Sequence, residues 1–384
     1  MALSGKFIRS TTAGEVVQAF VPDPLPPEPP IRLEEEDWDL YERANRALGR
    51  LDGVTGLLPD PTLFIYFYIR KEAVLSSQIE GTQSSLSELL VHENNETPGV
   101  PLDEITEVSN YVAAMEYGLK RLREDDFPIS LRLMKEIHNV LLEKGRGADK
   151  TPGEFRTSQN WIGGSRPGNA HFVPPPPDRV IECMGNLELF IHGNPKPYPL
   201  LIKTALAHVQ FETIHPFLDG NGRLGRLLVT LLLCAEDALT EPLLYLSLFF
   251  KQNRQEYYDR LQDVRMKGNW LGWLRFFLKG VHETAQGAVQ TSRRILQQFE
   301  EDATKVEALG TRAKSTPRIL RGLQRKPVLS VPKASEELDL SAPTVRSAVE
   351  SLVNLGILRE VTGKQRDRVY IYDPYVKILE EGTE

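Results

Sequence analysis

The stretch "HPFLDGNGRLGR" spans residues 215–226 and is followed at once by the apolar run "LLVTLLL". The first turn of a helix carries unpaired backbone N–H groups and a partial positive charge, so it attracts anions. Glycines just ahead of such a turn let an anion approach the backbone closely. We therefore expect a phosphate-binding loop opened by Gly220 and Gly222, with a buried helix from Leu224 onward. The stretch lacks the Gly-Lys-Ser/Thr ending of a Walker A loop, which indicates another kind of phosphate site.

The charged side chains of the same stretch suit a nucleotide. Arg223 and Arg226 lie three residues apart, so on a helix they share nearly one face and can both bind phosphate oxygens. Asp219 is the only carboxylate in the stretch, and Mg²⁺ commonly takes one or two protein carboxylates together with phosphate oxygens and water. His215 ends the preceding helix, where a neutral imidazole can remove a proton from an attacking hydroxyl. The pattern predicts a nucleotide phosphate site with its own base.

Two alternatives remain open for this region. A glycine-rich loop between two core helices is often only a connection. His208, Glu212 and His215 also lie at helical spacing and resemble metal ligands. No further ligand candidate is near them in the sequence, so we expect His208 to be a core residue or one that supports a site residue from behind.

Composition limits the class of protein. With 384 residues, 41% of them apolar and 26% charged, the chain has the composition of a soluble protein with two or three compact units. No apolar run approaches the roughly 20 residues that cross a bilayer, and the first residues lack a secretory signal. The two cysteines, Cys183 and Cys234, form no disulfide framework and no zinc spacing, which favours the reducing cytoplasm.

The distribution of charge and proline divides the chain. Residues 1–35 end in "VPDPLPPEPP" and predict a proline-rich arm that lies extended on a surface. Residues 36–300 repeat apolar positions at three- and four-residue intervals and predict a mainly α-helical domain. Within it, "GGSRPGNAHFVPPPP" (163–177) predicts a loop or short hairpin. We expect a linker over 301–314 and a further unit over 315–375.

The last unit has its own pattern and charge. The net charge of the chain is −7, yet from residue 311 onward 13 Lys and Arg outnumber 10 Asp and Glu. "ASEELDLSAPTVRSAVESLVNLGILREVTGKQRDRVYIYD" predicts a short helix, a longer helix with Ser341 as N-cap and Pro343 in its first turn, and then a β-hairpin. This pattern resembles a winged helix-turn-helix, which contacts DNA in some proteins and other proteins elsewhere. The side chains expected at the groove and in the wing are Thr344, Arg346, Lys364, Arg366 and Arg368.

The twelve-residue stretch resembles the signature of Fic-domain proteins, His-Pro-Phe-x-Asp/Glu-Gly-Asn-Gly-Arg-x-x-Arg, and agrees with it at every fixed position. "PGEFRTSQNWIGG" and "AHFVPPPP" resemble the segment that leads to this family's site and its substrate-positioning flap. "NRQEYYDRL" resembles the helix that closes over the adenine. The resemblance covers about residues 60–290. It implies a helical fold that transfers AMP from ATP to a Ser, Thr or Tyr hydroxyl of a protein and releases pyrophosphate.

The resemblance also implies a role for individual residues. His215 would be the base that activates the target hydroxyl, and Asp219 would hold Mg²⁺. Asn221 and the loop amides would bind the α- and β-phosphates, while Arg223 and Arg226 would bind the outer phosphates. The nucleotide contacts within the motif would be Gly220, Asn221, Gly222, Arg223, Leu224, Gly225 and Arg226.

Two further segments would complete the site. Tyr258 and Tyr257 would line the adenine pocket, although packing in the core explains either tyrosine equally well. The flap would pair with a backbone strand of the target protein. Its residues are Asn169, Ala170, His171, Phe172 and Val173.

The segment "SSQIEG" (76–81) resembles the family's inhibitory motif, Ser/Thr-x-x-x-Glu-Gly/Asn, at the end of a helix expected over about 62–81. Ser76 and Glu80 share a helix face, and Gly81 is a natural stop just beyond it. The resemblance implies that Glu80 pairs with Arg226 and occupies the space of the γ-phosphate. Two other interpretations remain: Glu80 is a solvated residue at a helix end, or it orients a water for the reverse, de-AMPylating reaction.

Two classes of function therefore follow from the sequence. One is an autoinhibited protein adenylyltransferase that uses ATP and Mg²⁺ and acts on a protein hydroxyl, its own included. The other is a DNA-binding transcriptional regulator that uses the winged helix and senses nucleotide through the Fic unit. We expect no membrane segment in either case, and the resemblance is compatible with a homodimer.

Overall fold

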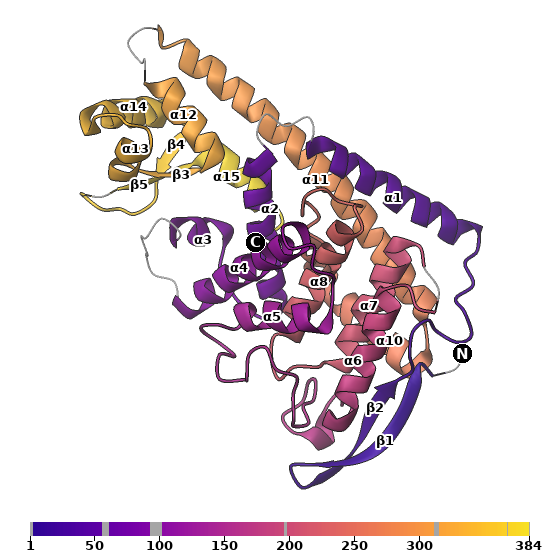
Figure 1. Cartoon of the computed structure of the whole chain (residues 1–384). Coiled ribbons are helices and arrows are strands. Elements are labelled where there is room, and N and C mark those ends of the chain that lie inside the picture. Colours follow the sequence, from indigo (N-terminus) through magenta and orange to yellow (C-terminus); the bar gives the residue numbers. More distant parts are fainter. Residues whose placement is uncertain are drawn as a thin grey trace.

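The computed structural model describes residues 3–55, 61–92, 102–195, 198–310, 315–366 and 368–383. These residues form a mainly helical fold, as the sequence predicts (Figure 1). The elements that precede the motif are β1 (Gly5–Thr12), β2 (Glu15–Pro22), α1 (Glu35–Thr55), α2 (Pro61–Ile79), α3 (Leu86–His92), α4 (Leu102–Arg123), α5 (Leu131–Leu141), η1 (Pro167–Asn169), α6 (Pro177–Ile191) and α7 (Leu200–Ile214). The elements that follow are α8 (Asn221–Ala235), α9 (Ser247–Gln252), α10 (Arg254–Lys267), α11 (Trp270–Glu307), α12 (Thr316–Arg325), β3 (Val328–Ser330), α13 (Val331–Glu337), α14 (Ala342–Asn354), β4 (Leu358–Glu360), β5 (Val369–Tyr372) and α15 (Asp373–Glu380).

The helix α7 forms the centre of the fold. Every residue from Leu201 to Ile214 is buried, because its apolar residues surround the helix instead of forming one stripe. Helices α6, α8, α10 and α11 pack around it. Polar groups inside this core form hydrogen bonds. For example, Trp273 donates its indole N–H to the carbonyl oxygen of Ala205 at 2.7 Å. The end of α7 is therefore held firmly, and that end carries the motif.

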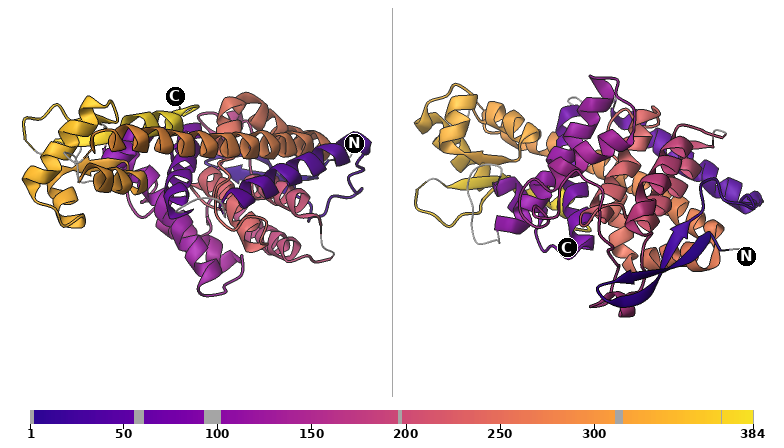
Figure 2. Two further views of the ribbon diagram at one scale, coloured as in Figure 1. Left: turned by 90° about the horizontal axis from the view of Figure 1, so that it is seen from above. Right: turned by 60° about the horizontal axis from the view of Figure 1, so that its bottom comes forward.

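The 38-residue helix α11 connects the two ends of the molecule (Figures 1 and 2). It runs beside α1 along the helical domain and reaches the C-terminal unit at its far end. Residues 301–307 belong to this helix, so the linker predicted over 301–314 is wrong for that part. This part of the helix is buried: Phe299 and Asp302 contact Tyr372 of the C-terminal unit, and Val306 is also buried. Residues 311–314 lie outside the described residues.

The N-terminal segment differs from the prediction of an extended arm over residues 1–35. Residues 5–22 form an antiparallel hairpin in which Gly5 pairs with Pro22 and Thr12 pairs with Glu15. Its two-residue turn, Ala13–Gly14, has positive φ at both positions, which matches the twist of a hairpin. Only residues 23–34 follow the prediction of an irregular, proline-rich stretch.

The C-terminal unit combines helices with a small sheet. Strand β5 lies between β3 and β4 and is antiparallel to both. The Ser341 side chain accepts a hydrogen bond from the backbone N–H of Thr344, which confirms it as the N-cap of α14. The structure adds β3 and α15 to the elements predicted for residues 315–375, and α15 extends the unit to Glu380.

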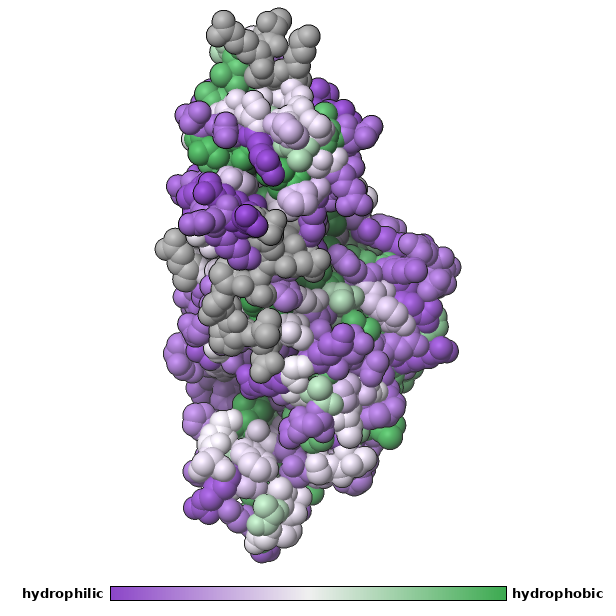
Figure 3. Space-filling model, turned by 90° about the vertical axis from the view of Figure 1, so that its left-hand side faces the viewer, coloured by the Kyte–Doolittle hydropathy of each residue, from purple (hydrophilic) through white to green (hydrophobic). Residues whose placement is uncertain are grey.

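None of the described helices combines the length and apolar character that a membrane-spanning helix needs. The side of the molecule that includes the C-terminal unit is dominated by hydrophilic residues, with apolar residues in small separate areas (Figure 3).

Candidate functional site

The motif forms a tight turn between α7 and α8. His215 ends α7 in the left-handed region at φ 50°, and Gly220 precedes α8 in the same region at φ 74°. The helix α8 begins at Asn221, so the predicted start at Leu224 is wrong by three residues. Asn221 and Gly222 accordingly belong to the first helical turn, and their backbone N–H groups are among those that a helix start leaves unpaired.

Asn221 closes this turn with its side chain. Its Oδ1 accepts a hydrogen bond from the backbone N–H of Phe217 at 2.9 Å, and its Nδ2 donates to the carbonyl oxygen of the same residue at 2.8 Å. Both ends of the amide are used inside the loop, and the residue is 1% exposed. The Asn221 side chain therefore shapes the loop, and a contact of Asn221 with phosphate would be made by its backbone N–H.

His138 of α5 supports the loop from below, a role that the sequence did not reveal. Its Nδ1 accepts a hydrogen bond from Gly153 N–H at 2.8 Å, so the proton lies on Nε2, which donates to the carbonyl oxygen of Asp219 at 3.0 Å. The ring stacks on Phe217 with centroids 3.7 Å apart. Burial lowers the pKa of His138 to about 4, which keeps this hydrogen-bond arrangement at neutral pH.

Arg156 holds the backbone of His215. Its Nε donates to the carbonyl oxygen of His215 at 2.9 Å, and its Nη2 donates to that of Pro175 at 2.6 Å. One buried guanidinium thus ties the end of α7 to the segment that follows the flap. The partners lie 59 and 19 residues away in the chain, so spacing alone could not indicate this role.

The environment of His215 keeps its imidazole neutral. Burial, together with the guanidinium groups of Arg265 and Arg156, lowers its pKa to about 3. A histidine that is neutral at physiological pH can accept a proton. The ring therefore has the protonation state that a base requires.

Arg226 is bound by the end of α2. Its Nε donates to Ser76 Oγ at 2.8 Å, and its Nη2 donates to Glu80 Oε1 at 2.7 Å and to the Ser76 carbonyl oxygen at 2.9 Å. Burial alone would raise the pKa of Glu80, but the guanidinium of Arg226, followed by that of Arg223, outweighs it and holds that pKa below its ordinary value. Gly81 follows with φ 105°. The contact between Glu80 and Arg226 has the geometry expected from the sequence.

Glu80 also lies against the first turn of α8. A Cβ on Gly222 would clash with Glu80 Oε1 and would come within 3.0 Å of Arg226 Nη1. The carboxylate therefore occupies space directly beside the helix start, where an anion would otherwise approach the backbone. A glycine at position 222 is what makes this approach sterically allowed.

Arg223 faces a different group of acids from Arg226. Its Nη1 lies 3.4 Å from Glu107 Oε2 of α4, and its Nη2 lies 3.7 Å from Asp219 Oδ1. Its Nε is buried and makes no hydrogen bond within the described part of the chain. Burial raises the pKa of Glu107 in spite of this neighbour. The two arginines thus flank the turn on separate sides, with one buried donor of Arg223 still available.

Asp219 is the residue of the turn with an open carboxylate oxygen. Its Oδ1 accepts from Gly220 N–H at 2.6 Å, whereas Oδ2 lies beside Gly147 and 3.9 Å from Arg146 Nε. No cluster of three His, Cys, Asp or Glu side chains suited to a metal occurs in the described ranges. A single accessible carboxylate fits Mg²⁺ that arrives with phosphates and water as its other ligands.

His208 and Glu212 lie beneath the motif on α7. His208 contacts the Gly225 carbonyl oxygen through Nδ1 at 3.0 Å and the Tyr257 hydroxyl through Nε2 at 2.9 Å, so it is a core residue, as expected. A Cβ on Gly225 would clash with Glu212 Oε1, which makes no hydrogen bond to any described residue. Gly225 therefore serves close packing of α8 on α7, and Leu224 beside it is 1% exposed.

The two tyrosines of α10 have different environments. Tyr257 is 1% exposed, its hydroxyl meets His208, and its ring stacks on Phe250 with centroids 4.5 Å apart. It fills the core, which is the alternative that the sequence left open. Tyr258 is 39% exposed and lies under Arg254, whose guanidinium carbon is 5.8 Å from the ring centroid. Of the pair, Tyr258 has the open ring face that a nucleobase could contact.

The flap is a narrow hairpin held from two sides. Ile162 and Phe172 form one antiparallel bridge, and the backbone N–H of Phe20 in β2 donates to the Val173 carbonyl oxygen at 2.9 Å. Arg265 of α10 lies over the Phe172 ring at 4.2 Å and donates to the Glu212 carbonyl oxygen at 2.9 Å. The N-terminal hairpin and Arg265 therefore position the flap, and neither was predicted to do so. Asn169, Ala170 and His171 lie on the returning arm of this hairpin, where the backbone N–H of His171 donates to the Ile162 carbonyl oxygen at 3.0 Å and Asn169 ends η1.

The overall fold is that of Fic-family structures. A Fic family protein from Desulfovibrio desulfuricans G20 superposes with a TM-score of 0.58 at 21% identity, covering 90% of this chain and 98% of that one. A Fic domain-containing signaling protein from Bacteroides thetaiotaomicron gives a TM-score of 0.51 at 18% identity, covering 67% and 97%.

Sequence comparison agrees with the fold. Residues 38–120 match the model described as Fic/DOC family N-terminal, and residues 128–233 match the model of the Fic/DOC family. The chain thus contains a Fic domain over residues 128–233, preceded by the N-terminal segment of that family.

Curated relatives are named protein adenylyltransferase Fic. The protein of that name from Aedes aegypti is 33% identical over 207 residues, which is 52% of this chain and 37% of the relative. The one from Culex quinquefasciatus is 32% identical over 203 residues, with the same shares. The match therefore spans little more than a third of the length of these relatives.

Proposed function

We propose that this chain is a protein adenylyltransferase whose activity is inhibited by its own Glu80. The observation that carries the proposal is the turn itself. It brings a neutral imidazole, the free N–H groups of a helix start and two buried guanidinium groups to one place. The names of the curated relatives support ATP as the substrate and proteins as the targets, and the family resemblance adds the hydroxyl as the acceptor.

The chemistry follows from the positions of these groups. The hydroxyl oxygen of the target attacks the α-phosphorus of ATP, its proton passes to His215, and the bond to the departing pyrophosphate breaks. The loop N–H groups and the guanidinium of Arg223 stabilise charge on the phosphates, which supplies most of the catalysis in such transfers. Mg²⁺, held by Asp219 together with phosphate oxygens, would supply further charge neutralisation when bound.

Glu80 accounts for inhibition. Its carboxylate lies where an outer phosphate would approach the first turn of α8, and it engages Arg226, which the family resemblance assigns to the same phosphate. With this pair formed, an outer phosphate would lose its guanidinium partner and meet a negative charge instead. ATP would then bind in a pose unsuited to in-line attack.

The direct test uses ATP labelled at the α-phosphate with Mg²⁺. We expect Glu80→Gly to raise AMP incorporation by about 5- to 150-fold, the range of typical coupling energies. Adding His215→Ala to that variant should lower it by roughly 10²- to 10⁴-fold, the usual contribution of a positioned base, while ATP still binds. Equal incorporation with and without His215 would remove its assignment, and no rise on loss of Glu80 would remove the inhibition. Release of AMP from modified protein under the same conditions would favour the reverse reaction.

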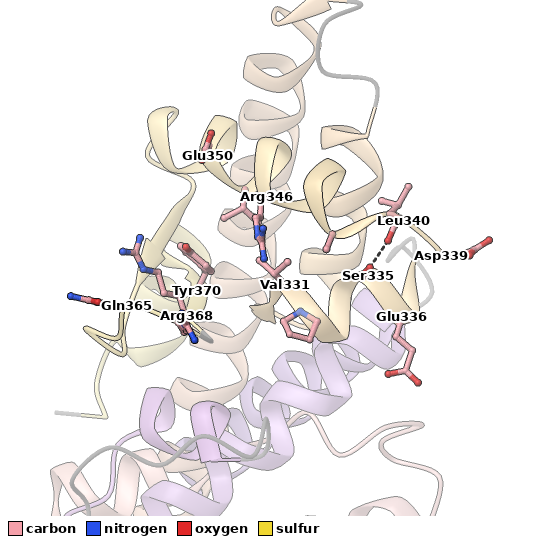
Figure 4. Close-up of a pocket in the computed structure, with 14 residues that line it drawn as sticks. Val331, Ser335, Glu336, Asp339, Leu340, Arg346, Glu350, Gln365, Arg368 and Tyr370 are labelled. Carbon is pink, nitrogen blue, oxygen red and sulfur yellow. Dashed lines mark hydrogen bonds between the residues drawn. The ribbon is translucent and has the colours of Figure 1, made fainter.

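A second function is supported by the C-terminal unit, which we infer to be a winged helix-turn-helix that binds duplex DNA. Arg346 of α14 faces Gln365 and Arg368 of the turn between β4 and β5, and Tyr370 of β5, across a groove of about 880 Å³ (Figure 4). Basic side chains on a helix and a wing suit phosphate contacts on both sides of a DNA groove. Acidic residues also line the groove, namely Glu336, Asp339 and Glu350.

The test of this second function is the salt dependence of DNA binding by the full chain. Phosphate contacts release counterions, so the affinity should fall linearly on a log–log plot as salt rises. The variant Arg346→Ala should weaken binding, while Arg179→Ala, an exposed position on α6, should leave it unchanged. Affinity that ignores both salt and Arg346 would favour a role in protein contacts instead.

A further inference from the structure

The chain returns to the inhibitory helix after leaving the C-terminal unit. Helix α15 follows β5 directly, and the marked C-terminal end lies beside α2 in the middle of the molecule (Figure 1). Tyr375 of α15 packs edge-to-face on Phe67 of α2 with ring centroids 5.0 Å apart. The helix that ends at Glu80 therefore has the C-terminal segment as a neighbour.

Residues 380–383, called the tail clamp below, are bound through backbone carbonyl oxygens and through carboxylates, such as that of Glu381, which pairs with Arg294. Lys71 Nζ of α2 donates to the Glu381 carbonyl oxygen at 2.9 Å. Gln78 Nε2 of α2 and Lys251 Nζ of α9 both donate to the Thr383 carbonyl oxygen, at 3.1 and 3.0 Å. Thr383 itself is only 5% exposed, so this segment is packed into the fold.

Lys71 shows how closely α2 depends on this segment. It is 3% exposed, and a buried ammonium group without a hydrogen-bond acceptor is strongly unfavourable. The Glu381 carbonyl oxygen supplies that acceptor, and the Tyr245 ring lies 4.8 Å from Nζ. Moving the tail clamp away would leave the ammonium to find other partners, and a shift of α2 would be one way to reach them.

The tail clamp also brackets the turn that contains Glu80. Gln78 lies two residues before Glu80, and its Nε2 donates to the Ser84 carbonyl oxygen at 3.0 Å as well as to Thr383. On the far side of the turn, the Glu380 carboxylate accepts from the backbone N–H of Ser87 at 3.0 Å. Both flanks of the inhibitory residue are thus fixed by residues 380–383.

We propose that the tail clamp is part of the inhibitory device: it holds α2 in the position in which Glu80 binds Arg226, and its release raises AMP transfer. The inference rests on the proposed function, since it assigns a cause to the inhibition by Glu80. It makes the C-terminal unit a regulator of the nucleotide site, because β5, α15 and the tail clamp form one continuous segment from the groove of Figure 4 to α2.

The experiment removes the donors that hold the clamp, in the full chain. Lys251→Met deletes the hydrogen bond to Thr383, and Lys71→Met deletes the one to Glu381. Both variants keep the aliphatic part of the side chain. Lys377→Met on α15 is the matched control, because Lys377 pairs with Asp373 and its side chain is 68% exposed. The readouts are AMP incorporation from labelled ATP and amide hydrogen exchange of residues 72–81, with Glu80→Gly measured alongside.

We expect Lys251→Met and Lys71→Met to raise incorporation by about 3- to 10-fold, the range that follows from the net loss of one typical intramolecular hydrogen bond. Exchange of residues 72–81 should accelerate in both, while Lys377→Met matches the wild type. The inference is overturned if Glu80→Gly raises incorporation and the two clamp variants change neither readout. If Glu80→Gly leaves incorporation unchanged, the proposed inhibition by Glu80 fails. Faster exchange of residues 72–81 in the clamp variants would then still show that the tail clamp holds α2.

Discussion

Glu212 is a buried acid whose charge the fold disfavours. Burial raises its pKa to about 7, although Arg226 opposes the shift. The pKa of Glu212 in the folded state therefore lies above the ordinary 4.5. The free energy of unfolding that the neutral form contributes is fully present below about pH 4.5 and is lost as the pH rises through about 7. Glu212→Gln mimics the neutral form, so it should raise the melting temperature by roughly 2–4 °C at pH 8 and change it little at pH 5. The exposed Glu256→Gln is the control, and equal shifts at both pH values would contradict the prediction.

His215 leads to a prediction about the pH dependence of the reaction. Its pKa is lowered to about 3, so the free enzyme holds a neutral imidazole throughout the range from pH 5 to 8. In the Glu80→Gly variant, the kcat/KM for ATP should therefore show no loss with an apparent pKa near 6.5, since that parameter reports the groups of the free enzyme. A fall of kcat/KM centred near pH 6.5, with no matching change in the affinity for ATP, would mean that His215 titrates as an exposed histidine does.

At the scale of elements, the local sequence pattern predicts the helices, but it does not predict features that depend on contacts between residues far apart in the chain. Helical spacing located α7 and α11, since their apolar residues recur within the segment itself. Two glycines in succession favour a loop, so the sequence predicts that α8 starts at Leu224. In the structure Gly222 lies inside the first helical turn, where the absence of a side chain lets Glu80 approach. The prolines of residues 22–30 indicate an extended arm, but they follow the hairpin of residues 5–22, whose strands flank the short turn Ala13–Gly14.

The site shows the same limit. The motif residues were predicted from one continuous stretch, but the residues that position it come from other helices. His138 and Arg156 act on carbonyl oxygens 81 and 59 residues away, and Glu107 meets Arg223 across 116 residues. Such contacts leave no period in a single sequence, so only the fold reveals them.

The N-terminal hairpin gives a prediction for the flap. Val17 and Ala19 of β2 form a small apolar cluster with Val173, and Val17 is 6% exposed. Val17→Asp would bury a charge in that cluster, so the flap should loosen. Hydrogen exchange of residues 162–173 should accelerate and transfer to a protein target should fall, while ATP binding stays unchanged. Val16→Asp, at a 55% exposed position of the same strand, should do neither; equal effects of the two substitutions would exclude a role of the cluster.

At the scale of the whole molecule, the two units share buried contacts and should unfold together. The Tyr372 hydroxyl of β5 donates to Asp302 Oδ2 of α11 at 2.8 Å, and both residues are fully buried. Tyr372→Phe leaves that carboxylate with one donor fewer, which should cost about 1–3 kcal/mol. Because α11 belongs to both units, the loss should lower the temperature of a single calorimetric transition. Tyr370→Phe removes a hydroxyl from the groove side of the same strand and should leave the transition in place. Two separate transitions, with only one lowered by Tyr372→Phe, would mean that the C-terminal unit folds on its own and that its hold on α2 is weaker than the contacts indicate.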